Sequence, residues 1–181
     1  MTSTPPVHFS HVGIFVTDIG RMERFYTEFL GFLVSDAGNL GTVRMVFLSR
    51  DPHDHHQIVL VEGRPPEAKF SVINQISLRV ENLDALRHFQ ANAAAHGATN
   101  VLAVTHGNAI SVYFWDPEGN RVEVFIDTPW YVQQPLREPI DLSLPDAQVW
   151  RWAEAHASKL PGFQPVEDWR QQLQKRVNHN A

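Results

Sequence analysis

Four polar side chains stand in stretches of this sequence where aliphatic residues otherwise alternate. They are His11, Gln75, Tyr113 and Glu123. Glu123 is flanked by Val122 and Val124, and a carboxylate on an inward face is costly unless it is paired or bound as a ligand. The sequence therefore leaves two roles for Glu123: an ion pair with Arg79 or Arg121, or a place in a functional site.

His11 opens a segment that the chain repeats. Residues 11–19, His-Val-Gly-Ile-Phe-Val-Thr-Asp-Ile, reappear 64 positions later as residues 75–83, Gln-Ile-Ser-Leu-Arg-Val-Glu-Asn-Leu. Because a period of this length occurs only twice, it indicates two similar modules within one domain and not a solenoid. A site between the modules should use residues of both copies. Taken alone, His11 could equally be a core histidine bonded to a carbonyl.

Each copy has the same order of predicted elements: a strand, a helix that ends near a glycine, a short strand, and two strands joined by an Asp-Pro turn. This order predicts an α+β fold of paired βαβββ modules. We expect module boundaries of 7–63 and 71–127 within one domain, 7–127. The strands are expected at residues 11–16, 33–34, 43–48 and 57–61, then at 75–80, 101–102, 109–114 and 121–126, with helices at 19–29 and 83–95.

The phase of the strands predicts which side chains face a cavity. In the second copy, Ile76, Leu78 and Val80 share one face of a strand, while the alternating polar positions share the other. If the helices pack on the aliphatic face, the polar face lines a cavity. His11, at the position equivalent to Gln75, then points into that cavity with Tyr113 and Glu123.

Composition excludes several classes of function. The net charge is −5 and no lysine or arginine run occurs, which argues against nucleic acid or an anionic membrane as partner. The absence of cysteine excludes disulfides and thiolate metal sites. The sequence lacks motifs of zinc peptidases, serine hydrolases and phosphate-binding loops. This charge pattern favours a small-molecule ligand. We expect a cytoplasmic protein, because no signal peptide or membrane-spanning segment is evident.

Residues 128–181 differ in character from the repeat. Prolines in the first part of this segment predict an extended chain that wraps over the modules without joining the sheet. A capping box from Ser143 to Asp146 predicts a helix that runs through Trp150 toward Lys159, and a second helix is expected at 166–177. The segment could be an arm of an oligomer or a lid over the site, and the sequence favours neither. We expect a homo-oligomer.

The motifs resemble those of the vicinal oxygen chelate proteins, a superfamily that includes glyoxalases, bleomycin resistance proteins and type I extradiol dioxygenases. The resemblance covers residues 7–127 and is carried by three motifs. They are His11-Val-Gly-Ile-Phe-Val16, Phe25-Tyr26 before Leu30-Gly31-Phe32, and Asp116-Pro-Glu-Gly-Asn-Arg-Val-Glu123. The resemblance implies paired modules whose strands form a cup-shaped mixed sheet around a divalent metal, followed here by a C-terminal helical extension.

Within the superfamily, the extradiol ring-cleaving dioxygenases are the most similar. The series His106, Tyr113, Asp116-Pro117 and Glu123 resembles the active-site stretch of their second module. The segment His55-His56-Gln-Ile-Val-Leu60 resembles the one that carries their acid/base histidine. The resemblance thus implies catalytic roles for His56, His106 and Tyr113, while His53 and His55 are expected to be solvated loop residues.

The same resemblance implies metal ligands at His11, Gln75 and Glu123. The dioxygenases have histidine at the position of Gln75, and their set of two histidines and one carboxylate holds Fe(II) with open positions. Fe(II) is the expected metal, with Mn(II) or another divalent ion as alternatives. The implied reaction is cleavage of a small catechol-like aromatic substrate by O₂, as in aromatic compound catabolism.

Two other functions remain open from the sequence. Glutamine occupies a metal position in some glyoxalases of the superfamily, which makes a glyoxalase-like or isomerase-like metalloenzyme the first alternative. The second is a metal-free protein of the same fold that binds an aromatic compound. Oxygen uptake distinguishes a dioxygenase from an isomerase, and metal content distinguishes both from a binding protein.

Overall fold

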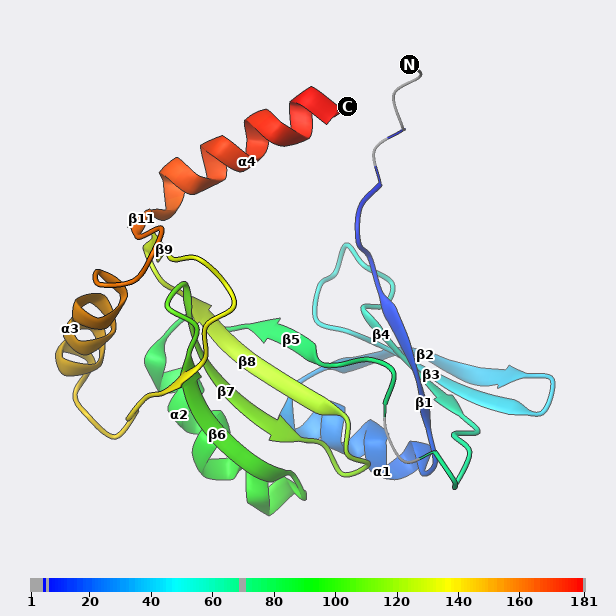
Figure 1. The fold of residues 1–181 in the computed structure, drawn as a ribbon. Coiled ribbons are helices and arrows are strands. Elements are labelled where there is room, and N and C mark those ends of the chain that lie inside the picture. The colour runs from blue at the N-terminus through cyan, green and yellow to red at the C-terminus, as the bar shows by residue number, and fades with distance from the viewer. Residues whose placement is uncertain (1–4, 6, 69–70, 181) are drawn as a thin grey trace.

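The computed structural model describes residues 5, 7–68 and 71–180, which form two open mixed sheets with helices packed against them (Figure 1). The first sheet has the strand order β1-β4-β3-β2, with β1 parallel to β4 and the other pairs antiparallel. Its elements are β1 (Val12–Val16), α1 (Ile19–Arg24), the π-helical turn η1 (Phe25–Phe29), β2 (Leu33–Leu40), β3 (Val43–Ser49) and β4 (Ile58–Glu62).

The second sheet repeats this arrangement in the order β10-β6-β7-β8-β5. Here β5 lies parallel to β8, and the register places Ser77 opposite Glu123. The α+β fold of paired βαβββ modules is therefore confirmed, with every predicted strand and both predicted helices present. The elements are β5 (Ile76–Arg79), α2 (Leu83–Asn92), the 3-10 turn η2 (Ala93–His96), β6 (Thr99–Thr105), β7 (Ala109–Trp115) and β8 (Arg121–Asp127).

Local sequence explains where the two module helices begin and end. The side chain of Asp18 accepts a hydrogen bond from the Arg21 amide, and that of Asn82 accepts one from the Ala85 amide, so both helices have an N-cap. The turn η2 that continues α2 ends at Gly97, whose φ of 81° lies in the left-handed region that glycine tolerates, and Gly31 after η1 has a φ of 71°. The equivalent positions in the two copies thus carry equivalent stop and start signals.

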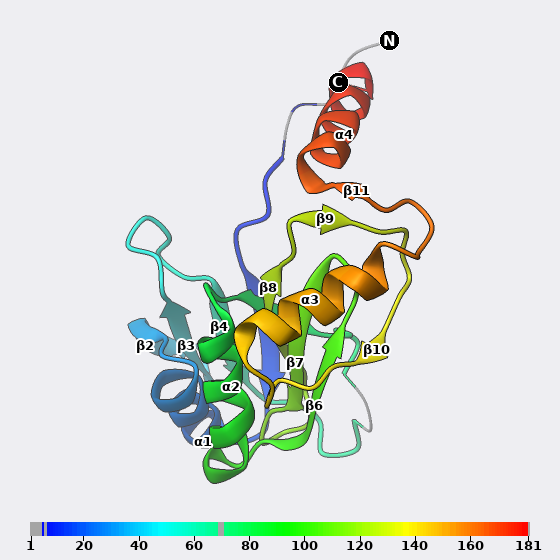
Figure 2. The same ribbon diagram turned by 90° about the vertical axis from the view of Figure 1, so that its left-hand side faces the viewer.

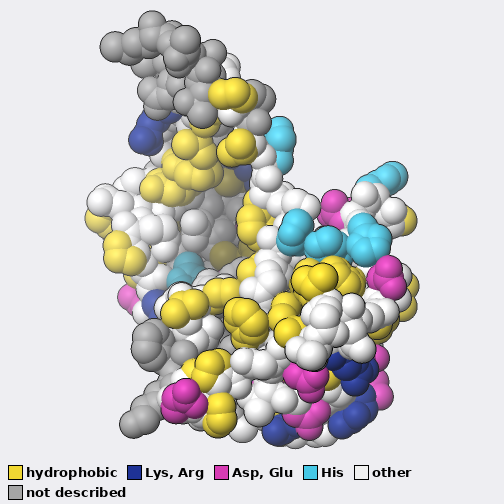
Figure 3. All heavy atoms as spheres, turned by 90° about the vertical axis from the view of Figure 1, so that its right-hand side faces the viewer, with side chains coloured by type: hydrophobic (Ala, Val, Ile, Leu, Met, Phe, Trp, Pro, Cys, Tyr) yellow, Lys and Arg dark blue, Asp and Glu magenta, His cyan; other side chains and the backbone are white. Residues whose placement is uncertain are grey.

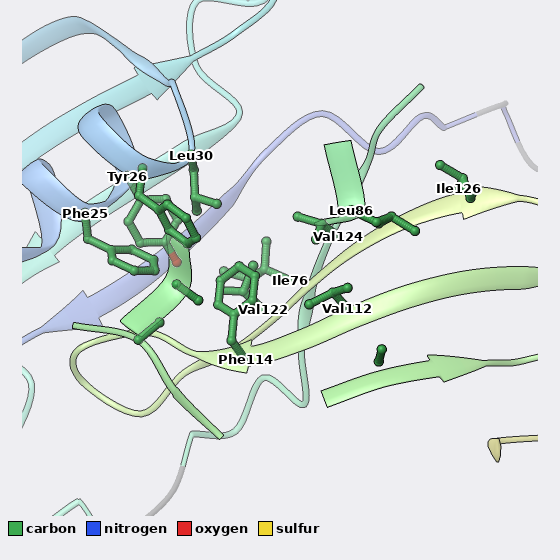
Figure 4. Close-up of a cluster of buried hydrophobic side chains, with 14 of the residues drawn as sticks. Phe25, Tyr26, Leu30, Ile76, Leu86, Val112, Phe114, Val122, Val124 and Ile126 are labelled. Atoms are coloured by element: carbon green, nitrogen blue, oxygen red, sulfur yellow. The ribbon is translucent and has the colours of Figure 1, made fainter. Parts of the chain in front are cut away.

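Aromatic side chains fill the core between the helices and the sheets. Phe29 contacts both Phe89 and Phe114, with ring centroids 5.3 and 5.4 Å apart, so the two helices meet across one aromatic cluster. Aliphatic side chains of β7 and β8, including Val112 and Val124, point into the same cluster (Figure 4). Each such buried side chain stabilises the fold by about 1.5–3 kcal/mol. The aliphatic faces of the strands are therefore occupied, and the polar faces remain for a site.

The C-terminal segment differs from the sequence prediction in two respects. Its strand β10 (Glu138–Pro139) joins the second sheet by pairing with β6, although we expected this part to stay outside the sheet. The pairing is compatible with Pro139 because β10 is an edge strand, where the missing amide faces away from the ladder. The predicted capping box is also wrong: Ser143 hydrogen-bonds to Asp141, and Pro145 precedes the helix without a side-chain cap.

Both predicted C-terminal helices are present, as α3 (Asp146–Ala157) and α4 (Val166–Asn180). The helix α3 lies beside α2 on the same side of the second sheet, where Arg87 of α2 pairs with Asp146 (Figure 2). The helix α4 projects away from both sheets. Short strands β9 (Trp130–Tyr131) and β11 (Gln164–Pro165) pair with each other. Within the described ranges, no helix is long and apolar enough to cross a membrane.

Candidate functional site

The carboxylate of Glu123 lies at the centre of a polar cluster on the open face of the second sheet. Its Oε2 accepts hydrogen bonds from Ser77 Oγ at 2.6 Å and Gln75 Nε2 at 2.9 Å. Its Oε1 accepts one from Ser111 Oγ at 2.7 Å. The side chain is 8% exposed, so these donors replace most of the water that would otherwise solvate it.

This environment fixes the ionisation of Glu123. Burial by itself raises the pKa of the carboxyl, but hydrogen bonds from His106, Ser77, Ser111 and Tyr113 outweigh burial and lower the pKa from 4.5 to about 2. Glu123 is therefore a carboxylate at neutral pH. No arginine pairs with it among the residues that the structure describes, since Arg79 pairs with Asp127 at 2.8 Å instead.

His106 and Tyr113 form a hydrogen-bonded pair beside Glu123. His106 Nε2 lies 3.0 Å from the Tyr113 hydroxyl and 3.6 Å from Glu123 Oε1. His106 Nδ1 lies 2.5 Å from the backbone carbonyl of Leu136, which can only accept, so Nδ1 carries a proton. Nε2 is then the ring atom that faces Tyr113 and Glu123: in the protonated ring it donates to Glu123, and in the neutral ring it can accept from the Tyr113 hydroxyl. This contact with the C-terminal segment sets the tautomer and orientation of the ring.

The charge of Glu123 affects both members of the pair. The pKa of His106 is raised, chiefly by its interaction with Glu123 and against the opposing effect of burial. Burial and then the nearby Glu123 raise the pKa of Tyr113 to about 12. Tyr113 is therefore a protonated phenol at neutral pH, able to donate a hydrogen bond to an oxygen atom of a ligand.

Gln75 occupies the predicted position but is oriented as a hydrogen-bond bridge. Its amide nitrogen donates to Glu123 and to Ser77, while its oxygen accepts from Arg121 Nη2 at 3.2 Å. For the amide oxygen to bind a metal, the amide group would have to rotate and release Arg121. In this arrangement Gln75 is a wall residue that holds Glu123 in place.

The other two predicted site residues, His11 and His56, lie together in the first module. Their ring centroids are 4.2 Å apart, and His55 Nδ1 lies 2.9 Å from His56 Nδ1 above Phe47. Figure 3 shows histidine side chains gathered in a row on this face of the molecule. Burial, and then the neighbouring His11 and His55, lower the pKa of His56, so that the ring is neutral at neutral pH.

The structure thus brings four of the six predicted site residues together and places the other two in a separate cluster. A cavity of about 480 Å³ contains Gln75, His106, Tyr113 and Glu123. A second cavity, of about 610 Å³, runs from Gln75 and Ser77 to Ser10, next to His11. Of the residues described, no three histidine, aspartate or glutamate side chains are grouped to hold a metal ion. A further cavity of about 700 Å³ contains Ser77 but none of the six.

Three contributors to the site were not predicted from the sequence. Ser111 shares a strand face with Tyr113, so the same alternation that pointed to Tyr113 could have identified it. The carbonyl of Leu136 and the side chain of Arg137 come from the C-terminal segment, and no periodicity there indicates which residues reach the cavity. Both depend on how the segment crosses the sheet.

Comparison with known families and structures agrees with the fold. The model of the Glyoxalase/Bleomycin resistance protein/Dioxygenase superfamily matches residues 8–124. The chain belongs to this superfamily. It is the vicinal oxygen chelate group that the sequence motifs indicated, and the match ends before the C-terminal segment begins. A comparison with curated proteins gave no match.

Several solved structures of the superfamily share the fold. A glyoxylase/bleomycin resistance protein/dioxygenase domain from Frankia sp. is 22% identical, with a TM-score of 0.59 over 68% of this chain and 94% of that one. The fosfomycin resistance protein FosX from Listeria monocytogenes, complexed with Mn(II) and sulfate, is 16% identical (TM-score 0.54; 68% and 95% covered). Leishmania major glyoxalase I is 22% identical (TM-score 0.52; 67% and 87% covered).

Proposed function

We propose that this protein is a metal-dependent, extradiol-type dioxygenase that cleaves a catechol-like aromatic substrate with O₂. The observation that supports it most is the contact of an ionised carboxylate, Glu123, with the hydrogen-bonded pair His106 and Tyr113 in one open cavity. A carboxylate at a metal beside two groups that can exchange hydrogen bonds with the oxygens of a diol is the arrangement that this reaction requires.

The donor chemistry of the cluster fits a divalent cation. Glu123 is buried and ionised, and among the described residues neither an arginine nor a lysine forms an ion pair with it, so its carboxylate can serve as an anionic ligand of a cation. Glu123 and, after rotation of its amide, Gln75 would hold the ion together with His11, with Fe(II) as the proposed metal and Mn(II) as the alternative. When bound, the metal would hold the adjacent oxygens of the substrate and O₂ side by side.

The residues around Glu123 would position the substrate. The Tyr113 hydroxyl keeps its proton at neutral pH and can donate to one substrate oxygen. His106, whose Nδ1 is anchored to the Leu136 carbonyl, presents Nε2 on the same side and can accept the proton of the substrate hydroxyl. These two groups would orient the diol before reaction, which is a large part of the advantage of an enclosed site.

His56 is the proposed general acid/base. Its lowered pKa makes the ring neutral at neutral pH, the form that can accept a proton. Within one chain, His56 contacts His11 and does not contact Glu123. To reach the carboxylate, both histidines would therefore have to come from another copy of the chain.

We propose that a second copy of the chain supplies them in a homo-oligomer. The open face of the first sheet is uncovered in the single chain, where Phe15 is 62% exposed and Leu40 is 75% exposed. If the second sheet of another copy covered this apolar face, the face would be buried next to Glu123 of that other copy. Sedimentation of wild type should give a dimer or larger, and a strictly monomeric species with full activity would contradict this arrangement.

A glyoxalase-like or isomerase-like metalloenzyme is the alternative function. The observation that favours it is Gln75, which contacts Glu123 at the position where a dioxygenase would have a histidine. In that case Glu123 would transfer a proton on the bound substrate and O₂ would have no part. A small aromatic ligand held without metal or turnover is the third outcome.

Oxygen consumption and metal content distinguish these functions. The full chain is reconstituted anaerobically with Fe(II) and mixed with substituted catechols, and we expect oxygen uptake and a yellow ring-opened product. Tyr113→Phe should slow turnover by about 10²- to 10⁴-fold with metal retained. Tyr131→Phe is the matched control, because Tyr131 stacks on Trp169 outside the cavity. Absence of uptake by metal-loaded wild type would exclude the dioxygenase, and isomerisation of a thiohemiacetal would identify the alternative.

A further inference from the structure

Two arginine side chains converge on the ring of Tyr113 at the mouth of the cavity. The guanidinium carbon of Arg121 lies 5.4 Å from the ring centroid, and that of Arg137 lies 5.5 Å from it. Arg121 comes from β8, whereas Arg137 comes from the C-terminal segment beyond the part of the chain that matches the superfamily. The cavity thus contains a cation that is supplied by this chain's own extension.

Neither guanidinium group is neutralised by the protein. Among the residues that the structure describes, no carboxylate forms an ion pair with Arg121 or Arg137, whereas Arg79, on the same sheet, pairs with Asp127. Arg121 donates to the neutral oxygens of Gln75 and Asn74, and its Nε is buried with no hydrogen-bond partner among the described groups. Arg137 is exposed at the rim and has no hydrogen bond to a described side chain. Donors of this strength normally have an anionic partner.

The charge in the cavity indicates what kind of anion would fit. Arg137 lines the cavity and Arg121 lies beside it against the Tyr113 ring, while the oxygens of Glu123 already accept hydrogen bonds from Ser77, Ser111 and Gln75. The two unpaired guanidinium groups therefore remain available to an anionic group of a ligand. A volume of about 480 Å³ suits a single aromatic ring with a short substituent. A guanidinium fork matches the planar geometry of a carboxylate.

We propose that the cavity selects aromatic substrates that carry a carboxylate group, and that Arg137, assisted by Arg121, binds this group. This inference rests on the proposed function, because it names the substituent of the substrate whose diol is held near Glu123. The carboxylate would lie at the rim, between the C-terminal segment and the Tyr113 ring, and the reacting end of the substrate would point inward.

Calorimetric titration of the full chain under anaerobic conditions tests the inference without turnover. The probes are 3,4-dihydroxybenzoate, its methyl ester, benzoate and inorganic phosphate. Wild type should bind the acid about 10- to 100-fold more tightly than the ester, the range expected for a charge-assisted hydrogen bond. Arg137→Gln should remove most of this preference and leave the affinity for the ester unchanged. Arg151→Gln is the matched control, since Arg151 is exposed on α3 and does not line the cavity.

Several results would overturn the inference. Equal affinity of wild type for acid and ester, an equal loss for both probes in Arg137→Gln, or stronger binding of phosphate than of benzoate each contradict a carboxylate site. Failure of this inference can be distinguished from failure of the dioxygenase proposal. A preference for the acid that depends on Arg137, without any oxygen uptake, would refute the proposed function alone. Oxygen uptake that is equal for neutral and acidic catechols would refute the carboxylate site alone.

Discussion

Replacing Glu123 by glutamine removes the charge of this side chain and nearly preserves its shape. In the folded chain, burial alone raises the pKa of Glu123, but the hydrogen bonds from His106, Ser77, Ser111 and Tyr113 overcome it and lower the pKa from 4.5 to about 2. A change of that size corresponds to about 3 kcal/mol of folding free energy. The ionised carboxylate is therefore expected to stabilise the metal-free protein at neutral pH.

The sign of the pH dependence follows from the direction of the shift. Because the pKa is lower in the folded than in the unfolded chain, the stabilisation is fully present above pH 4.5 and is lost as the pH falls toward 2. Glu123→Gln lacks this contribution at every pH. The difference in unfolding free energy between wild type and the variant should be about 3 kcal/mol at neutral pH and should shrink through this range.

Urea unfolding of chelator-treated protein measures this difference. Glu62→Gln is the matched control, because Glu62 is exposed at the end of β4 and should show almost no effect at any pH. A loss for Glu123→Gln that stays constant from neutral pH to acid would refute the argument, since it would reflect altered packing and not an ionised carboxylate. A gain in stability would refute it equally.

Three further predictions concern the metal, the ligand set and the C-terminal segment. His11→Ala should abolish binding of the single divalent ion expected per chain, as measured by elemental analysis; full metal occupancy in the variant would remove His11 from the site. Gln75→His should tighten Fe(II) in competition with a chelator if position 75 is a ligand, and unchanged affinity in a folded variant would place Gln75 in the wall only. Gly107→Ala should destabilise the fold by about 2 kcal/mol or more, because Gly107 has a φ of 74° and an added Cβ would collide with Val132. Gly38→Ala is its control in thermal melts, since nothing lies near that position; equal melting temperatures for the two variants would contradict the prediction.

The repeat made the fold and half of the site predictable. Alternation of aliphatic and polar residues gave the facing of β5 and β8, and the parallel pairing of these strands places Ser77 opposite Glu123. The same reasoning required Tyr113 to lie on that face, as it does. These positions follow from the two-residue period of a strand, which a single sequence contains in full.

The remaining features depend on contacts that no local pattern encodes. Periodicity within each copy specifies a face but not the distance between two faces, so the separation of the His11 cluster from Glu123 was not foreseen. The hydrogen bond between His106 Nδ1 and the Leu136 carbonyl joins residues that lie 30 positions apart in the sequence. The extended part of the C-terminal segment has no repeat and no amphipathic period to indicate its path. Edge pairing by Pro139 shows that a proline excludes only central strand positions.

The Asp-Pro turn of the second module shows how far the two copies have diverged. Glu118 in this turn accepts hydrogen bonds from the amides of Thr17 and Asp18 at the start of α1, at 2.6 to 2.9 Å. Arg64 donates to the Glu118 carbonyl from the segment that links the modules. The corresponding turn of the first copy has His53 at the position of Glu118, and its amide donates to Asp51 within the same turn; among the described residues, its side chain forms no hydrogen bond to the second module.

One of the two equivalent turns thus joins the halves, while the other carries histidines at the surface. A gene fragment that encodes the first half alone would leave the amides of Thr17 and Asp18 without their acceptor. The duplicated halves have in this way become mutually dependent, and the chain should unfold as one cooperative unit.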